Sequence, residues 1–270
     1  MRPPDRVTRS ALQRAVEAPA AAIDRALNRG ARSLAARTLP FYRRHPYRGG
    51  LGLFTADMRG AYSPEDGFFY NRVPKAANST VMKTLAEHAA FSRRLGRDRA
   101  KSRFLRPTLM SASQVAALDA TFRFTFVRDP YARVLSAFAD KVLRKRRQAR
   151  GFYDRIGGVG EGPPDFVAFL RYLEAGGLHA DAHWAPQADL MLLPVADFDL
   201  VGRVETLGRD LATVLDRVFG APPPERLRRA GPRTDAAARF AEIWTPEAVA
   251  LVNALYAADF ELFGYRRRPA

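Results

Sequence analysis

Two segments of this chain each read as a short apolar strand that runs straight into a helix, with basic and hydroxyl side chains at the junction. The strands are predicted at Gly67–Val73 and Phe122–Val127, and helical periodicity begins at Thr80 and at Tyr131. A third strand is predicted at Asp197–Val204. Strands that alternate with helices indicate a parallel sheet covered by helices on both faces. We therefore expect an α/β fold in which both junctions lie at one edge of the same sheet.

Further helices are predicted around these strands. They are expected at Ser113–Ala120, Tyr131–Arg147, Asp165–Leu173, Thr206–Phe219 and from Thr245 onward. Asp165 and Thr245 are the predicted N-caps of their helices, and Pro246 suits a first helical turn. No internal repeat is visible. We expect residues 51–270 to form one domain, preceded by an N-terminal extension of residues 1–50.

The extension is rich in alanine and arginine and is predicted to be helical. Its apolar residues recur at helical spacing, at Leu12, Val16, Ile23, Leu27 and Leu34. A basic amphipathic helix of this kind could lie on an anionic membrane, pack back onto the protein, or serve as a mitochondrial presequence. We favour packing onto the protein, and we keep a peripheral membrane contact through residues 1–50 as an alternative.

The charge of the chain is strongly positive. Lysine and arginine number 44 against 28 acidic residues, which gives a formal net charge of +16. Such a field attracts anionic ligands, membranes or nucleic acid, although many of the arginines could simply be solvated. The chain has no cysteine, which excludes disulfides and thiolate metal sites. It also has no run of 18 apolar residues that could span a bilayer.

The first junction has the composition of an anion-binding loop. A helix N-terminus leaves backbone N–H groups unpaired, and the aligned peptide dipoles add positive potential there. Ala76 and Ala77 are small enough for an anion to approach the backbone, and Lys75 adds a mobile charge. Further donors come from Asn78, Ser79 and Thr80. The alternative is that Ser79 or Thr80 is an ordinary N-cap and Lys75 a surface residue. A P-loop kinase is disfavoured because the G-x-x-x-x-G-K-[ST] pattern is missing.

The second junction combines an arginine with a capped helix. Asp129 and Pro130 fit the N-cap and first turn, which leaves Arg128 at the end of the strand. Arginine binds two phosphate oxygens in its own plane, and Ser136 could add a hydroxyl from two turns into the helix. The alternative is that Arg128 only pairs with Asp129. Two such junctions together suggest a nucleotide that carries anionic groups at two positions.

Together the two segments resemble the donor-binding motifs of the carbohydrate sulfotransferases related to the HNK-1 and chondroitin enzymes. The resemblance rests on residues 73–80, on residues 126–138 and on His183-Trp184-Ala185-Pro186-Gln187, and it extends through residues 198–207 and 256–265. It implies a P-loop-NTPase-like sulfotransferase fold and a donor, 3′-phosphoadenosine 5′-phosphosulfate (PAPS). It also implies that residues 75–80 hold the 5′ end of the donor and that Arg128 and Ser136 hold the 3′-phosphate. The expected acceptor is a hydroxyl of a carbohydrate.

Sulfuryl transfer needs charge stabilisation and a base. Lys75, with the amides of residues 76–80, is the candidate for the charge that grows on the bridging phosphate oxygen, and Arg72 could assist or be a surface residue. His183 is our first candidate for the general base, because its ordinary pKa is near neutrality, and a purely structural role is its alternative. Glu205 is the second candidate, unless it holds Arg203 or caps the helix at Thr206. Arg233 and Thr234 are further candidates for contacts with the donor, and no ligand cluster for a metal is present.

Two rival functions remain at the level of the sequence. The charge could instead serve a nucleic-acid-binding protein or a membrane-surface scaffold without catalysis, but no aromatic-interleaved recognition motif supports specific nucleic-acid binding. The resemblance lacks the membrane anchor and cysteines of the Golgi relatives, and Asn78 stands where small or hydroxyl residues are usual. We therefore expect a bacterial, cytoplasmic enzyme, with a peripheral position at the inner membrane surface as the alternative that residues 1–50 permit.

Overall fold

The computed structural model describes residues 26–90, 104–158, 164–221 and 241–270. Arg233 and Thr234 lie outside these ranges, as do residues 1–25 of the predicted extension. A four-stranded sheet forms the centre of the molecule, in the order β1 (Gly60–Ser63), β2 (Phe68–Asn71), β3 (Phe122–Val127) and β4 (Leu200–Arg203). Strands β2, β3 and β4 are parallel, and β1 pairs antiparallel to β2 at one edge.

The three parallel strands are those expected from the sequence, and the α/β prediction is confirmed. β1 was not predicted, because its four residues, Gly-Ala-Tyr-Ser, are too short and too mixed to show an alternating pattern. It is nevertheless wholly buried, since it pairs with β2 and also forms a bridge from Tyr62 to Leu105.

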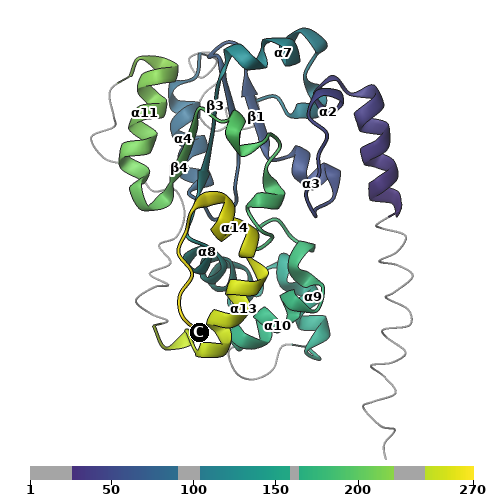
Figure 1. Ribbon diagram of the computed structural model, residues 1–270, viewed down its shortest axis with the longest axis vertical. Helices are drawn as coiled ribbons and strands as arrows, with labels where there is room; N and C mark the ends of the chain where they lie inside the picture. The colour runs from purple at the N-terminus through teal and green to yellow at the C-terminus, as the bar shows by residue number, and fades with distance from the viewer. Residues whose placement is uncertain (1–25, 91–103, 159–163, 222–240) are drawn as a thin grey trace, which may run out of the picture.

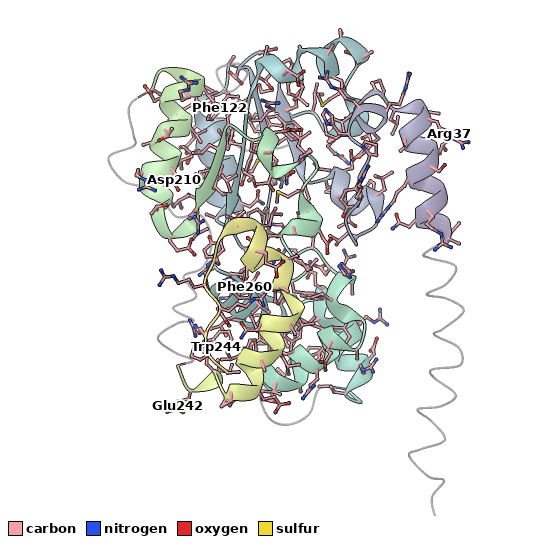
Figure 2. All side chains as sticks on the ribbon, in the orientation of Figure 1. Arg37, Phe122, Asp210, Glu242, Trp244 and Phe260 are labelled. Atoms are coloured by element: carbon pink, nitrogen blue, oxygen red, sulfur yellow. The ribbon has the colours of Figure 1, made fainter. Side chains whose placement is uncertain are left out.

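Helices cover both faces of the sheet and continue beyond one end of it (Figure 1). Those that border the sheet are α2 (Pro40–Arg44), α3 (Leu53–Asp57), α4 (Asn78–His88), α7 (Ala112–Ala116) and α11 (Leu207–Phe219). Those beyond its end are α8 (Pro130–Ala137), α9 (Arg150–Arg155), α10 (Phe166–Glu174), α13 (Pro246–Leu255) and α14 (Ala257–Phe263). Because α8 follows β3 directly, this helical half lies at the carboxyl end of the parallel strands, and Figure 2 shows Trp244 and Phe260 within it.

Alternation along the strands divides the core into two layers. Phe68, Tyr70, Phe124 and Phe126 point to the face covered by α4 and α11, and the rings of Tyr70 and Phe124 stack with centroids 4.9 Å apart. Phe69 points to the opposite face, where it stacks on an aromatic ring of α2. Aromatic side chains on both faces bury large apolar areas, which explains why a sheet of such short strands holds together.

The predicted N-terminal extension packs onto the rest of the protein where the structure describes it. Residues 26–38 are helical, and Ala35 on this helix is 4% exposed. Asn28 accepts a hydrogen bond from the amide of Leu53 and donates one to the carbonyl of Leu51. Phe41 belongs to the same core cluster as Phe69, although it lies within residues 1–50. The domain boundary at residue 50 and the membrane contact stay predictions.

The helix expected at Tyr131–Arg147 is shorter in the structure. α8 ends at Ala137 and continues as one wider π turn at Phe138–Val142, where the amide of Leu143 donates to the carbonyl of Phe138. Four consecutive cations at residues 144–147 follow, and like charges one turn apart disfavour continued helix. The predicted N-caps Asp129, Asp165 and Thr245 are confirmed, each accepting from the amide three residues on.

No helix within the described ranges is long and apolar enough to cross a membrane.

Candidate active site

The loop after β2 has the backbone geometry of an anion-binding site. Lys75 and Ala77 both have left-handed backbones, with φ of 67° and 55°, a conformation that side chains with a Cβ rarely adopt. Ala77 is the N-cap of α4, and no side chain caps the helix, so neither Ser79 nor Thr80 plays that role. The amides of Asn78 and Ser79 donate to no other described residue. Successive N–H groups in turns of this kind form concave sites for anions.

Lys75 points from this loop toward α8. Its Nζ donates to a carboxylate oxygen of Asp140 at 3.0 Å, and its side chain is 15% exposed. Burial lowers the pKa of Lys75, and its hydrogen bond to Asp140 opposes that change. Burial alone would raise the pKa of Asp140, but hydrogen bonds from Lys75 and Lys141 lower it below the ordinary value. The lysine is therefore held as a cation beside a carboxylate, over the loop that would receive an anion.

The second junction lies against the first. The amide of Ala132 donates to Asp129, so Asp129 caps α8 as predicted, and Arg128 does not simply pair with it. The Nη1 of Arg128 instead donates to the backbone carbonyl of Lys75 at 3.3 Å. The guanidinium of Arg128 and the loop that carries Lys75 are therefore side by side at the carboxyl edge of the sheet.

One face of α8 is turned toward the first loop. Arg133, Ser136 and Asp140 follow one another at spacings of three and four residues, which places them on the same side of a helix. Arg133 reaches the carbonyl of Pro74, and Asp140 reaches Lys75. Ser136 lies between these two anchors along the chain and is 4% exposed, and its contact with the donor stays a prediction.

Arg72 has a neighbour that the sequence did not single out. The amide of Arg72 donates to the carbonyl of Arg59 at 2.7 Å, and the Nε of Arg72 donates to the side chain of Asn78. Burial lowers the pKa of Arg59 to about 10, with Arg72 adding to that effect, and burial also lowers the pKa of Arg72. The charge of Asp181 raises the pKa of Arg59, although no ion pair joins the two side chains. These two cations extend the positive surface beside the loop.

His183 forms a pair with Asp181. The carboxylate of Asp181 accepts hydrogen bonds from the amide of His183 at 2.8 Å and from its ring Nδ1 at 2.5 Å. Burial lowers the pKa of His183, Asp181 opposes the change, and the charges of Lys141 and Lys75 favour it. The ring is therefore neutral at pH 7. No described residue hydrogen-bonds its Nε2, so a histidine held through Nδ1 presents its second nitrogen as a base.

Glu205 is engaged at the same edge in a different way. Its carboxylate accepts from the amide of Asp129 at 2.8 Å and from the hydroxyl of Tyr265 at 3.0 Å. It therefore joins the N-terminus of α8 to the C-terminal segment, and it holds neither Arg203 nor the helix at Thr206. Its proposed part as a base stays a prediction.

A separate cavity of about 650 Å³ lies elsewhere on the protein. It is lined by Arg44, His45, Arg48 and apolar residues 191–195, among others, and by no residue that the sequence proposed for the site. Among the described residues, no group of three His, Asp or Glu side chains is arranged to hold a metal ion.

The sequence missed the residues that hold the site together. Asp140, Asp181, Arg133 and Asp259 carry no motif of their own, because each makes its contacts across more than 40 residues or within an irregular loop. The only available signal was proximity: Asp140 lies one turn after Ser136, and Asp181 two residues before His183.

Comparison with known proteins agrees with the family resemblance seen in the sequence. Residues 59–266 match the model of the sulfotransferase family. This chain belongs to that family. It is 31% identical over 218 residues to carbohydrate sulfotransferase 14 of Mus musculus, an alignment that covers 73% of this chain and 57% of the relative.

Two further relatives are also carbohydrate sulfotransferases. Carbohydrate sulfotransferase 14 of Danio rerio is 31% identical over 165 residues, which cover 53% of this chain and 44% of the relative. Carbohydrate sulfotransferase 10 of Danio rerio is 26% identical over 232 residues, or 72% of this chain and 62% of the relative. The chain thus spans roughly half the length of the curated relatives it matches. No solved structure matches it.

Proposed function

We propose that this sulfotransferase-family protein transfers a sulfuryl group from PAPS to a hydroxyl of a carbohydrate. The observation that carries the proposal is the contact of Arg128 with the carbonyl of Lys75, which joins the two anion-binding junctions at one edge of the sheet. The names of the relatives support the acceptor class, since they are carbohydrate sulfotransferases.

The residues present suit both ends of the donor. Arg128 and Ser136 would hold the 3′-phosphate, because a guanidinium and a hydroxyl together satisfy several phosphate oxygens. The amides after Ala77 and the ammonium of Lys75 would hold the 5′-phosphosulfate. This division gives the 3′-phosphate its own cation, and it therefore predicts discrimination against nucleotides that lack this phosphate.

PAPS supplies the sulfuryl group and a good leaving group. In the transfer the acceptor oxygen bonds to sulfur while the bond between sulfur and the bridging phosphate oxygen breaks, and the acceptor proton moves to a base. The ammonium of Lys75 would stabilise the negative charge that grows on the departing phosphate oxygen. The Nε2 of His183 would take the proton, because the ring is neutral and is oriented by Asp181.

Calorimetric titration with the product nucleotide, 3′-phosphoadenosine 5′-phosphate, tests the donor assignment. We expect it to bind at least tenfold more tightly than AMP, and the difference should disappear in Arg128→Ala. Equal affinity for the two nucleotides in the wild-type protein would reject the 3′-phosphate site. Transfer of radiolabelled sulfate from PAPS to a panel of glycan, lipid and peptide hydroxyls then tests the acceptor class. Transfer to lipid or peptide hydroxyls, with none to glycans, would reject a carbohydrate as the acceptor.

A further inference from the structure

A fully buried arginine links the two loops that carry the proposed catalytic groups. Arg133 is 0% exposed. Its Nε donates to the carbonyl of Pro74 at 3.0 Å, its Nη1 to Ala185 at 2.7 Å and its Nη2 to Ala182 at 3.1 Å. Pro74 immediately precedes Lys75, whereas Ala182 and Ala185 lie on either side of His183. One planar group therefore holds both loops.

The charge of Arg133 is balanced without a direct ion pair. Asp259, also 0% exposed, accepts from the amides of Gln187 at 2.9 Å and of Ala188 at 2.8 Å. Arg133 thus binds carbonyls of the loop over residues 182–188, and Asp259 binds its amides. Buried charges are tolerated when every polar contact is satisfied, and here the loop lies between the cation and the anion.

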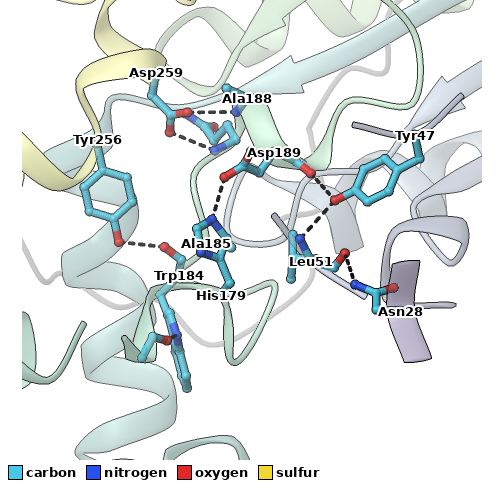
Figure 3. Close-up of polar contacts among 12 residues, drawn as sticks. Asn28, Tyr47, Leu51, His179, Trp184, Ala185, Ala188, Asp189, Tyr256 and Asp259 are labelled. Atoms are coloured by element: carbon cyan, nitrogen blue, oxygen red, sulfur yellow. Dashed lines mark hydrogen bonds and ion pairs between the residues drawn. The ribbon is translucent and has the colours of Figure 1, made fainter. Parts of the chain in front are cut away.

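Neighbouring contacts make the rest of this loop rigid. The hydroxyl of Tyr256 donates to the carbonyl of Trp184 at 2.6 Å, and Asp259 holds the loop farther along (Figure 3). The buried Gln187 donates to the carbonyl of Arg128 at 2.8 Å and accepts from its amide at 2.9 Å. Gln187 therefore joins the loop to the second junction. Among the described residues, Arg133 supplies the side-chain hydrogen bonds that join it to the first junction, where Val73 and Ala185 also lie in one apolar cluster.

We propose that Arg133, with Asp259 as its partner across the loop, is a positioning residue that sets the place of His183 relative to Lys75. The inference rests on the proposed function of these two residues. A guanidinium suits this part because its fork is rigid and always charged, whereas a lysine cannot reach three carbonyls in one plane.

Arg133→Lys tests the proposal because it keeps the charge and removes the fork. We expect kcat to fall about 10- to 100-fold, since a displacement of about 1 Å can cost that much. Affinity for 3′-phosphoadenosine 5′-phosphate should stay within about threefold, because Arg128 and Ser136 remain. The matched control is Arg203→Lys, whose guanidinium also donates to a backbone carbonyl, that of Phe263, which belongs to neither loop. The control should keep kcat within about twofold.

A pH profile separates positioning from simple loss of structure. Burial and the charges of Lys75 and Lys141 hold the pKa of His183 below its ordinary value. If the loop moves away from them, that pKa rises, and the acid limb of kcat/KM should move to higher pH in Arg133→Lys but not in Arg203→Lys. An unchanged kcat, or a loss of kcat matched by an equal loss of nucleotide affinity, would overturn the proposal.

A second variant and a measurement independent of activity complete the test. Asp259→Asn should show the same fall in kcat and the same shift, and the double variant should lose less than the product of the two single losses. Hydrogen exchange at the amides of Gln187 and Ala188 should become faster in both single variants. Unchanged exchange in both variants would refute the role of Arg133 and Asp259 in holding the loop. If exchange becomes faster in both variants but the wild-type protein transfers no sulfuryl group, only the proposed function is refuted.

Discussion

At the scale of single residues, the backbone of the proposed site is strained at Lys75, the residue that carries its ammonium group. Lys75 keeps a left-handed backbone, with φ of 67°, although most residues with a Cβ avoid it. Such conformations cost of order 1–3 kcal/mol and persist where the surrounding structure fixes them. The contacts of Asp140 and Arg128 on either side of Lys75 fix this one. This backbone conformation lets one short loop carry both the ammonium of Lys75 and the unpaired amides of Asn78 and Ser79.

Lys75→Ala should separate turnover from binding. We expect kcat to fall roughly 100- to 1000-fold, the usual effect of removing one donor to a developing charge. Affinity for 3′-phosphoadenosine 5′-phosphate should weaken less than in Arg128→Ala, which removes the cation of the 3′-phosphate. Calorimetry and sulfate transfer measure the two effects. Lys83→Ala, on the helix α4 that follows this loop, is the control and should change neither. A near-normal kcat in Lys75→Ala would reject the role of Lys75.

The pair of His183 and Asp181 predicts a pH dependence with a definite sign. Activity requires neutral His183, so it should fall only below the ordinary pKa range of histidine, because burial lowers the pKa of His183. Asp181 raises that pKa, so Asp181→Asn should move the acid limb of kcat/KM to still lower pH, while kcat drops roughly 10- to 100-fold through lost orientation.

The control for this variant is Asp189→Asn. It alters a second histidine–aspartate pair, with His179 at 2.7 Å, and should leave the acid limb in place. A shift to higher pH in Asp181→Asn would show that His183 is not the titrating base.

At the scale of elements, α8 and the π turn after it organise the second junction. The turn at Phe138–Val142 adds one residue to a helical turn, and Asp140 within it meets Lys75. Single π turns inside helices are frequent at functional sites. Asp140 follows Ser136 by four residues, so it stays on the side of α8 that faces Lys75, and the π turn then ends the regular helix before Arg147.

Asp140→Asn should change how Lys75 titrates. Asp140 raises the pKa of Lys75 against the effect of burial, so the pKa should fall further in the variant. Lys75 must carry its proton to stabilise the leaving group. Activity should therefore be lost at lower pH on the alkaline side of the profile than in the wild-type protein.

Asp154→Asn removes an exposed partner of Arg150 on α9 and should not shift the alkaline limb. An alkaline limb that moves to higher pH in Asp140→Asn would contradict the role of this carboxylate.

At the scale of the whole molecule, the sheet brings distant segments to one edge. The junctions after β2 and β3 are separated by about 50 residues of sequence, and the His183 loop by about 50 more. Parallel pairing places the ends of β2 and β3 together, and the helical half lies beyond this edge of the sheet (Figure 1). The net charge of +16 makes the protein as a whole attractive to anions.

The net charge also predicts how the protein treats nucleic acid. Binding to duplex DNA should be independent of sequence and should weaken at least 100-fold between about 50 and 200 mM salt, because it depends on counterion release. Binding of 3′-phosphoadenosine 5′-phosphate, measured in parallel by calorimetry, should weaken far less. Salt-insensitive or sequence-specific DNA binding would revive the nucleic-acid alternative.

Local sequence patterns were enough to predict the three parallel strands, the N-caps and the two strand-to-helix junctions. These depend on local chemistry: apolar runs, capping side chains and the residues that follow a strand. Asp129 and Thr245 could be assigned as caps because a cap acts on amides three residues away. The candidates Lys75, Arg128 and His183 came from local segments as well.

Which of these segments meet, and what holds them, follows from the tertiary structure. Arg133 binds carbonyls 49 to 59 residues away, and Asp259 binds amides 71 and 72 residues away. The antiparallel edge strand β1 and the π turn at Asp140 were also decided there. Contacts at such separations depend on how the sheet and the helices pack, and no local pattern of residues records that packing.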